Sequence, residues 1–159
     1  MRFLPGPKTS APEPSFMFQI DAREEALLLV ILRLYPVLEN GYHRLSKDPQ
    51  TAGSAEQRLL EESMAQQRAA HRRKLDELFL APQRFFKQAG GGRRLILSGE
   101  QFEWLLKVLN DIRVGSWVRL GCPDLEASAP LAPTRANARH LEAMHLSGHF
   151  QMALLEAVK

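Results

Sequence analysis

The chain has 159 residues, of which 45% are hydrophobic and 25% charged, with a formal net charge of +3. That length suits one domain with a buried core, and the average composition excludes wholesale disorder. A single cysteine, Cys122, excludes an intrachain disulfide, and the longest apolar run, residues 26–32, is far too short for the roughly 18 residues of a membrane span. Without a secretory signal at its start, the sequence predicts a cytoplasmic protein with no membrane partner.

Residues 1–14 contain four prolines and are predicted to form an extended arm or tail outside a single helical domain of residues 15–159. Residues 15–20 alternate, with Phe16, Phe18 and Ile20 on one side, which is typical of a strand. Asp21 and Glu24 have the spacing of a capping box. They predict the start of a helix that is apolar nearly all round, buried by neighbours on several sides and ended near Tyr35 by Pro36.

Turn residues fill 40–54, and a second long helix is expected over residues 55–80. We expect 83–87 to form a short turn of helix before the Gly90-Gly91-Gly92 connector. This connector lacks the ending of a phosphate-binding loop and leads into a strand, so the pattern argues against a nucleotide site.

Residues 93–97 form a second strand-like segment, followed by Ser98 as helix cap and Gln101 at the box position. The third helix is expected over residues 102–120, and a fourth from about residue 134 to the C-terminus. The predicted inner face of the fourth helix comprises Leu141, Met144, Gly148, Met152 and Leu155. The predicted fold is mainly α: a bundle of about four helices with a small two-stranded ribbon of 15–20 and 93–97.

One arginine, Arg113, falls inside the apolar stripe of the third helix on a helical wheel. A buried guanidinium must find an anion or carbonyl groups, because it cannot lose its proton. A structural bridge to Asp21, Glu24, Glu25 or Glu142 is the favoured interpretation. The alternative is an anion-binding pocket formed by Asn110, Arg113 and Arg119. A glycine within a helix is costly, so Gly115 predicts the close approach of another helix.

The stretch from Trp104 through Asn110, Asp111 and Arg113 to Gly121 resembles the hallmark of an uncharacterised bacterial family, a domain of unknown function. The family pattern is W-L-x-x-L-N-D-x-R, two or three residues, then G-x-R-L-G. In this chain Gly115 stands earlier relative to Arg119 than the family's glycine does. The resemblance implies a helical fold and, through neighbouring genes for a protease adaptor and a metallo-isopeptidase-like protein, a link to protein turnover. It implies no activity.

Three further groups of residues give only weak evidence of a metal site, a nucleic-acid surface or a reactive thiol. Glu142, His145 and His149 share a side of the last helix, yet two further ligands would have to come from elsewhere, so we expect no metal. The basic run Arg68, His71, Arg72, Arg73 and Lys74 does not gather its charges on one side, which argues against nucleic acid. Cys122 is interpreted as an incidental thiol.

No complete catalytic set is found, so no catalytic residue and no cofactor is predicted, and the balance favours a protein that is not an enzyme. The favoured function is a protein-interaction or regulatory module with an unknown protein partner, linked to proteolysis by its resemblance. The first alternative is a binder of a small anionic ligand, or an enzyme, that uses Asn110, Arg113 and Arg119. The second is nucleic-acid binding through the basic middle third.

Overall fold

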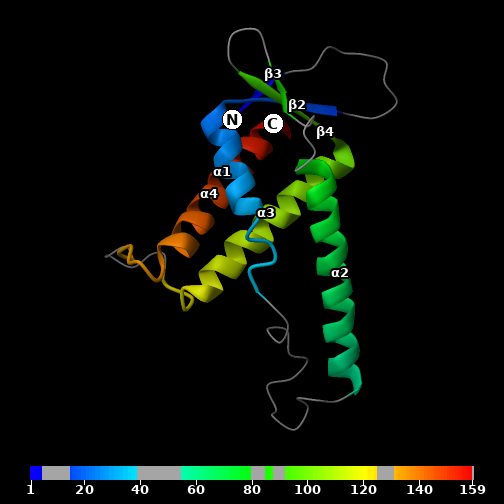
Figure 1. Cartoon of the computed structure of the whole chain (residues 1–159), viewed down its shortest axis with the longest axis vertical. Coiled ribbons are helices and arrows are strands. Elements are labelled where there is room, and N and C mark those ends of the chain that lie inside the picture. Colours follow the sequence, from blue (N-terminus) through cyan, green and yellow to red (C-terminus); the bar gives the residue numbers. More distant parts are fainter. Residues whose placement is uncertain (5–14, 39–54, 80–84, 88–91, 125–130, 159) are drawn as a thin grey trace.

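The computed structural model describes residues 1–4, 15–38, 55–79, 85–87, 92–124 and 131–158. In chain order they form β1 (Arg2–Leu4), β2 (Ser15–Ile20), α1 (Ala22–Leu32), α2 (Ala55–Phe79), β3 (Phe85–Lys87), β4 (Arg93–Ser98), α3 (Gly99–Arg119), α4 (Ala138–Leu155) and a short 3₁₀ turn, η2 (Glu156–Val158). A small sheet lies at one end of the molecule, and the helices extend away from it (Figure 1). The mainly α fold is confirmed.

The sheet is antiparallel with strand order β1-β2-β4-β3, so the predicted ribbon of two strands is its centre and not the whole. β2 pairs with β4 from Ser15 opposite Ser98 to Ile20 opposite Arg93. The prediction missed the two edge strands. Arg2–Leu4, within the predicted arm, pairs with β2. Phe85–Lys87, expected as a turn of helix, pairs with β4 instead.

Each central strand leads directly into a capped helix, as predicted. The Asp21 carboxylate accepts from the backbone N–H of Glu24 at 2.8 Å, and the Glu24 carboxylate accepts from that of Asp21 at 3.0 Å. Ser98 and Gln101 make the same reciprocal pair at the start of α3, at 3.2 and 3.1 Å. These bonds satisfy backbone donors that a helix start otherwise leaves unpaired.

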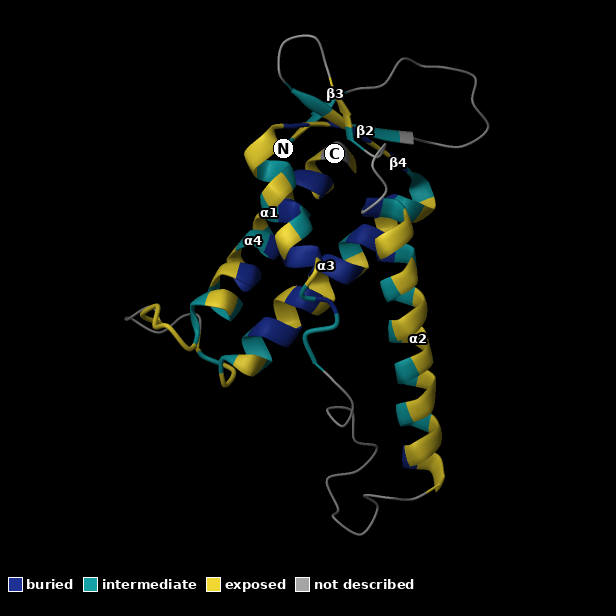
Figure 2. Cartoon of the chain, viewed as in Figure 1, coloured by how far each residue is buried: buried dark blue, intermediate teal, exposed yellow. Residues whose placement is uncertain are grey.

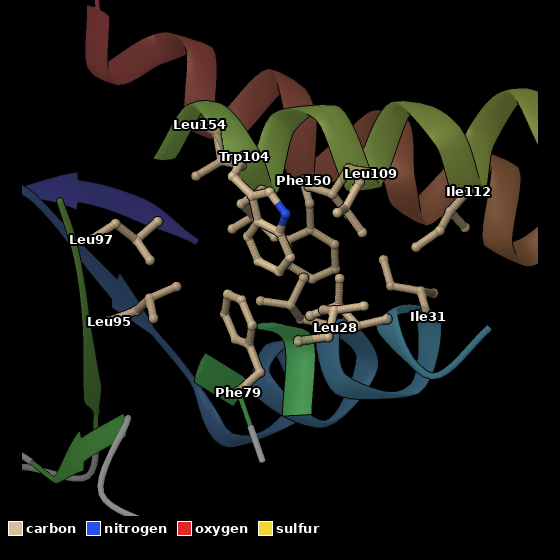
Figure 3. Packing of buried hydrophobic residues seen from close by; sticks show 14 of the residues in the cluster. Leu28, Ile31, Phe79, Leu95, Leu97, Trp104, Leu109, Ile112, Phe150 and Leu154 are labelled. Atoms are coloured by element: carbon tan, nitrogen blue, oxygen red, sulfur yellow. The ribbon is translucent and has the colours of Figure 1, made fainter. Parts of the chain in front are cut away.

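The core lies where α1, α3 and α4 meet the inner face of the sheet (Figure 3). The strands contribute Phe18, Ile20, Leu95 and Leu97, all fully buried, which confirms the predicted alternation in β2. α3 packs most extensively against α4. The largest buried side chains of these two helices include Leu105, Leu109, Ile112, Phe150 and Leu154.

Two helices are buried differently from the prediction. In α4 the core face comprises Ala143, Met144, Ser147, Phe150, Ala153 and Leu154. Met152 and Leu155, expected inside, are 69% and 48% exposed. α1 is also buried on one face only, because Val30 is 56% exposed. Both helices carry apolar residues on two sides, so the positions of these residues alone did not identify which side faces the core.

Helix α2 covers the predicted range but departs from the other helices along its length (Figures 1 and 2). Leu75 and Phe79 at its C-terminal end are buried against the core. Between Ala55 and Ala70 the only buried side chain is Gln57, and Leu59 is 66% exposed. The helix is therefore attached to the body mainly near its C-terminal end.

Candidate functional site

A cleft of about 290 Å³ opens where α2 and α3 diverge. Its third wall is the segment 35–38 that follows α1. The lining residues are Tyr35, Pro36, Val37, Leu38, Met64, Gln67, Arg68, His71, Lys107, Asn110, Asp111, Val114 and Gly115. Three elements that are distant in sequence thus converge on one concave surface, which is the usual form of a binding site.

Gly115 allows the third wall to lie against α3. A β-carbon added at Gly115 would stand 2.9 Å from Cβ and 3.3 Å from Cγ1 of Val37, and 3.4 Å from Cγ of Leu38. The prediction that this glycine permits a close approach is confirmed. The prediction of which element approaches is wrong. The segment next to Gly115 is the chain that follows the cis Tyr35–Pro36 peptide, and not another helix.

A hydrogen bond joins Tyr35 to His71 across the back of the cleft, with 3.0 Å between the tyrosine oxygen and Nδ1. Burial, and secondarily the nearby Asp111 carboxylate, raise the pKa of Tyr35 to about 12, so the phenol keeps its proton. Burial lowers the pKa of His71, with help from Lys107 and Lys74, and outweighs the opposing effect of Asp111. The tautomer of His71 sets the direction of this bond, because the phenol is able both to donate to Nδ1 and to accept from an Nδ1–H.

Arg72 and Trp104 hold α2 in place behind this pair. The Nη1 atom of Arg72 donates to the carbonyl oxygens of Tyr35 at 2.6 Å and Arg33 at 3.3 Å, where α1 ends. The Trp104 ring lies edge-on to His71 and carries the ammonium of Lys74 at 5.3 Å from its centroid. These contacts fix the orientation of His71 relative to α3.

The cleft lining combines polar and apolar side chains. Arg68 and Lys107 supply positive charge, and Asp111 supplies the negative charge among the lining residues. Asn110 and Gln67 add amide groups, and all of these except the half-buried Arg68 are exposed. The apolar lining residues are Pro36, Val37, Leu38, Met64 and Val114. Such a mixed surface suits a ligand that is itself amphipathic.

The predicted burial of Arg113 is wrong, because its side chain is exposed. Its stem lies beside Gly148 of α4, with Cδ 3.9 Å from a β-carbon added there, and Nη1 donates to Oε1 of Gln151 at 3.4 Å. The buried residues of α3 include Trp104, Val108 and Gly115, which lie on a different side of the helix from Arg113. The centre of the buried face is therefore turned away from Arg113, which extends its charge to solvent.

The acidic opening turn of α1 has other partners than the predicted one. Glu25 binds Arg93 of β4 through both carboxylate oxygens at 2.9 Å, and Glu24 contacts the amino group of Met1. The ion pair predicted between the first turn of α1 and Arg113 is therefore replaced by one between α1 and Arg93 of β4.

The other predicted residues divide between two places. Asn110, Asp111 and Gly115 line the cleft, and Trp104 lies behind it. Arg119 is exposed, and its Nε donates to the carbonyl oxygen of Val37 at 3.4 Å. Of the predicted anion site, Asn110 alone is among the cleft residues; Arg119 binds the backbone of the cleft residue Val37, and Arg113 binds Gln151 of α4.

The basic run of α2 does not form one face. Arg68 lines the cleft, Arg72 binds the end of α1, Arg73 is exposed, and Lys74 lies over Trp104. Glu142, His145 and His149 are all exposed, as is Cys122. Within the described ranges, no group of three or more His, Cys, Asp or Glu side chains is placed to hold a metal ion. In the same ranges, no helix is long and apolar enough to cross a membrane.

Sequence reasoning missed Tyr35, His71 and the 35–38 wall as parts of the site. Two signals were present: a proline directly after an apolar helix, and a mid-helix glycine that required a close neighbour. Neither signal identifies which distant segment meets Gly115, because that depends on how α1 sits against α3.

Together the fold and the cleft define a mainly helical domain with a small antiparallel sheet and an amphipathic cleft between α2 and α3. The chain belongs to the family described as Domain of unknown function (DUF2017), whose pattern matches residues 9–158. Neither a curated protein nor a solved structure matches the sequence.

Proposed function

We propose that this protein is a non-catalytic protein-interaction module that takes a short segment of a partner protein into the α2–α3 cleft. The observation that carries the proposal is the amphipathic lining, which combines apolar side chains of three elements with charged and amide groups of α2 and α3. A polypeptide segment presents the same mixture of apolar side chains, charges and backbone groups. The volume of about 290 Å³ suits a few residues and not a whole helix.

The polar groups at the back of the cleft support a binding role and not a catalytic one. Tyr35 and His71 bond to each other, and Arg72 holds their helix to the end of α1. These groups shape the cleft by fixing its walls. The family resemblance, with its implied link to protein turnover, favours a regulatory protein that acts through a partner.

A capture experiment with matched variants tests the proposal. Val114 lines the cleft and is 45% exposed, whereas Val30 is 56% exposed on α1, away from the cleft. Val114→Glu places a charge on the apolar wall, and Val30→Glu makes the same change elsewhere. We expect one or more proteins from native extract to be retained by wild type and Val30→Glu and lost on Val114→Glu. Equal retention by all three, or loss on Val30→Glu instead, contradicts the assignment to this cleft.

A second candidate is a binder of a small anionic ligand. The observation in its favour is that Arg68 and Lys107 both line the cleft beside Asn110. In this version the two cations take the role that Arg113 and Arg119 had in the sequence-based hypothesis. Thermal unfolding with organic acids, nucleotides and phosphates tests it, because a ligand at about 100 times its Kd stabilises the folded state by about 2.7 kcal/mol. A set of such compounds without any shift counts against it.

A further inference from the structure

We infer that the protein has a second docking surface, a groove between α1 and α4 that takes an amphipathic helix of a partner protein. The partner helix carries apolar side chains along one face and acidic side chains at one end of that face. The inference goes beyond the proposed function and does not depend on it, because the groove and the α2–α3 cleft share no lining residue.

The groove has a volume of about 290 Å³ and a mostly apolar lining. Its apolar residues are Leu27, Val30 and Ile31 of α1, Leu34 just after it, and Ala143 and Leu146 of α4. Ile31 and Ala143 are buried, whereas Val30 is 56% exposed, so the lining grades from the core to the solvent. An apolar concavity bordered by charged residues is typical of a surface that binds another protein.

The lining has a helical repeat on both elements. Positions 27, 30, 31 and 34 and positions 139, 142, 143 and 146 each follow the spacing i, i+3, i+4 and i+7, over about 10 Å of helix. A further helix suits such a groove, because its side chains also repeat about every 5.4 Å. Side chains on one face of an extended strand repeat about every 6.8 Å, which does not match the two rows.

The two helices of the groove run in opposite directions relative to the sheet (Figure 1). α1 begins directly after β2, whereas α4 leads into η2, which contacts β1. Arg33 follows the last residue of α1, and Arg139 is the second residue of α4. Both arginines therefore lie at the end of the groove away from the sheet, and Glu142 is about one turn of α4 nearer to it.

The charged residues of the groove are available to a partner. Arg33, Arg139 and Glu142 are exposed, and within the part of the chain that the structure describes their side chains make no ion pair or hydrogen bond. The two guanidinium groups at one end outnumber the single carboxylate. They favour a partner with acidic side chains at that end and disfavour a basic one.

Other occupants satisfy these features less well. A small anion pairs with the arginines but leaves Val30 and the apolar lining in water. A second copy that docks the same face brings four arginines together with two glutamates, so that like charges outnumber opposite ones. An amphipathic helix with acidic residues covers the apolar rows and pairs the arginines together.

Fluorescence polarisation with synthetic peptides tests the inference. The probe is a labelled pool of peptides of about 14 residues, near the length at which an isolated helix begins to form, with Leu, Ile or Met at i, i+3, i+4 and i+7 and Glu at one end. One control pool has Lys in place of Glu, and another has the same composition with its apolar residues at alternate positions. We expect the alternating pool not to bind. The Lys pool should bind about tenfold more weakly than the Glu pool, the size expected for one or two exposed charge pairs, and this difference should shrink with salt.

Matched variants assign the binding to the groove. Val30→Glu should abolish binding of the Glu pool, whereas Leu59→Glu, the same kind of change at a 66% exposed site of α2, should leave it unchanged. Arg139→Glu should remove the preference for Glu over Lys, and Arg73→Glu, an exposed arginine of α2, should keep it. Val30 and Arg139 are both exposed, so unchanged thermal unfolding is expected for the two variants, and each gives an independent result.

Several outcomes overturn the inference. No binding of the Glu pool, or binding that Val30→Glu leaves intact, removes the groove as its site. Equal binding of the alternating pool indicates an extended segment, and equal binding of the Lys pool removes the acidic preference. Sedimentation of the wild type as a dimer that Val30→Glu converts to a monomer shows a second copy in the groove.

The proposed function is decided separately. A protein held in the α2–α3 cleft should be lost on Val114→Glu and kept on Val30→Glu. Peptides held in the α1–α4 groove should show the reverse, so the failure of one assignment leaves the other intact.

Discussion

The layer formed by the sheet with α1, α3 and α4 differs from helix α2 in how it is held. The layer buries large apolar side chains from β2, β4, α1, α3 and α4, among them Phe18, Leu28, Leu109 and Phe150. α2 is 25 residues long, yet it contributes Leu75 and Phe79 to that core, near one end. The layer therefore holds most of the buried apolar core, while α2 adds two core residues near one end and is exposed or half-buried over most of its length (Figure 2).

The largest expected effect is a loss of stability when a core residue of the layer is truncated. Leu109→Ala removes a fully buried side chain at the α3–α4 contact and should lower the free energy of unfolding by about 2–5 kcal/mol. Leu59→Ala, the same change at a 66% exposed site of α2, should stay within about 0.5 kcal/mol. Urea unfolding monitored by circular dichroism measures both. Similar losses for the two variants would show that α2 is packed as firmly as the layer.

The junction between the two regions is tested at Gly115. Gly115→Ala places a β-carbon 2.9 Å from Val37, and the overlap should cost about 1–3 kcal/mol, against a gain of up to about 1 kcal/mol in helix propensity. Gly148→Ala in α4 meets its nearest atom, Cδ of Arg113, at an ordinary 3.9 Å and should stabilise by about 0.5–1 kcal/mol. Urea midpoints of opposite sign confirm the close approach. A stabilised Gly115→Ala variant contradicts it.

The attachment of α2 is tested at Arg72. Arg72→Ala removes the hydrogen bonds to the carbonyl oxygens of Tyr35 and Arg33, and should weaken the hold on α2 by about 1 kcal/mol because the site is partly exposed. Hydrogen exchange should then quicken in α2 and not in α3. Arg73→Ala, one residue along and exposed, is the control and should leave exchange unchanged. Faster exchange throughout the molecule would mean that α2 does not open separately.

The smallest effect is a dependence on pH. The pKa of His71 is lowered by burial in the folded state, so near pH 6 the unfolded chain binds more protons than the folded one. Stability should therefore fall as pH drops below the unfolded value of about 6.5, and level off above it. His140, whose pKa burial also lowers, contributes with the same sign. In His71→Asn the urea midpoint should depend less steeply on pH between 5 and 7 than in wild type. An unchanged slope would show that His71 does not cause this pH dependence.

The parts of the fold that the sequence predicted are those encoded locally. Alternation over residues 15–20 and the paired caps at Asp21 and Ser98 concern neighbours in the chain, and the structure has them as expected. The edge strands β1 and β3 have three residues each, too few for an alternating pattern, and exist because a longer strand lies beside them. Such elements depend on tertiary contacts that no short window contains.

The candidate site shows the same division. Asn110, Asp111 and Gly115 were singled out from α3, and the structure places all three at the cleft. Arg113 was misplaced because a wheel assumes one buried side, whereas α3 is buried against α4 on one side and approached by residues 37–38 on another. The opposite walls, including His71 and Tyr35, could not be predicted, since they lie far from α3 in the sequence.

The pairing of β2 with β4 has a consequence for the order in which the chain assembles. Its register pairs Ser15 with Ser98, so the two strands can pair only after the chain between them has folded back. α3 and α4, in contrast, are neighbours in the chain and share the most extensive contact. An early hairpin of these two helices, with the strands docking on it late, is the folding route that this arrangement favours.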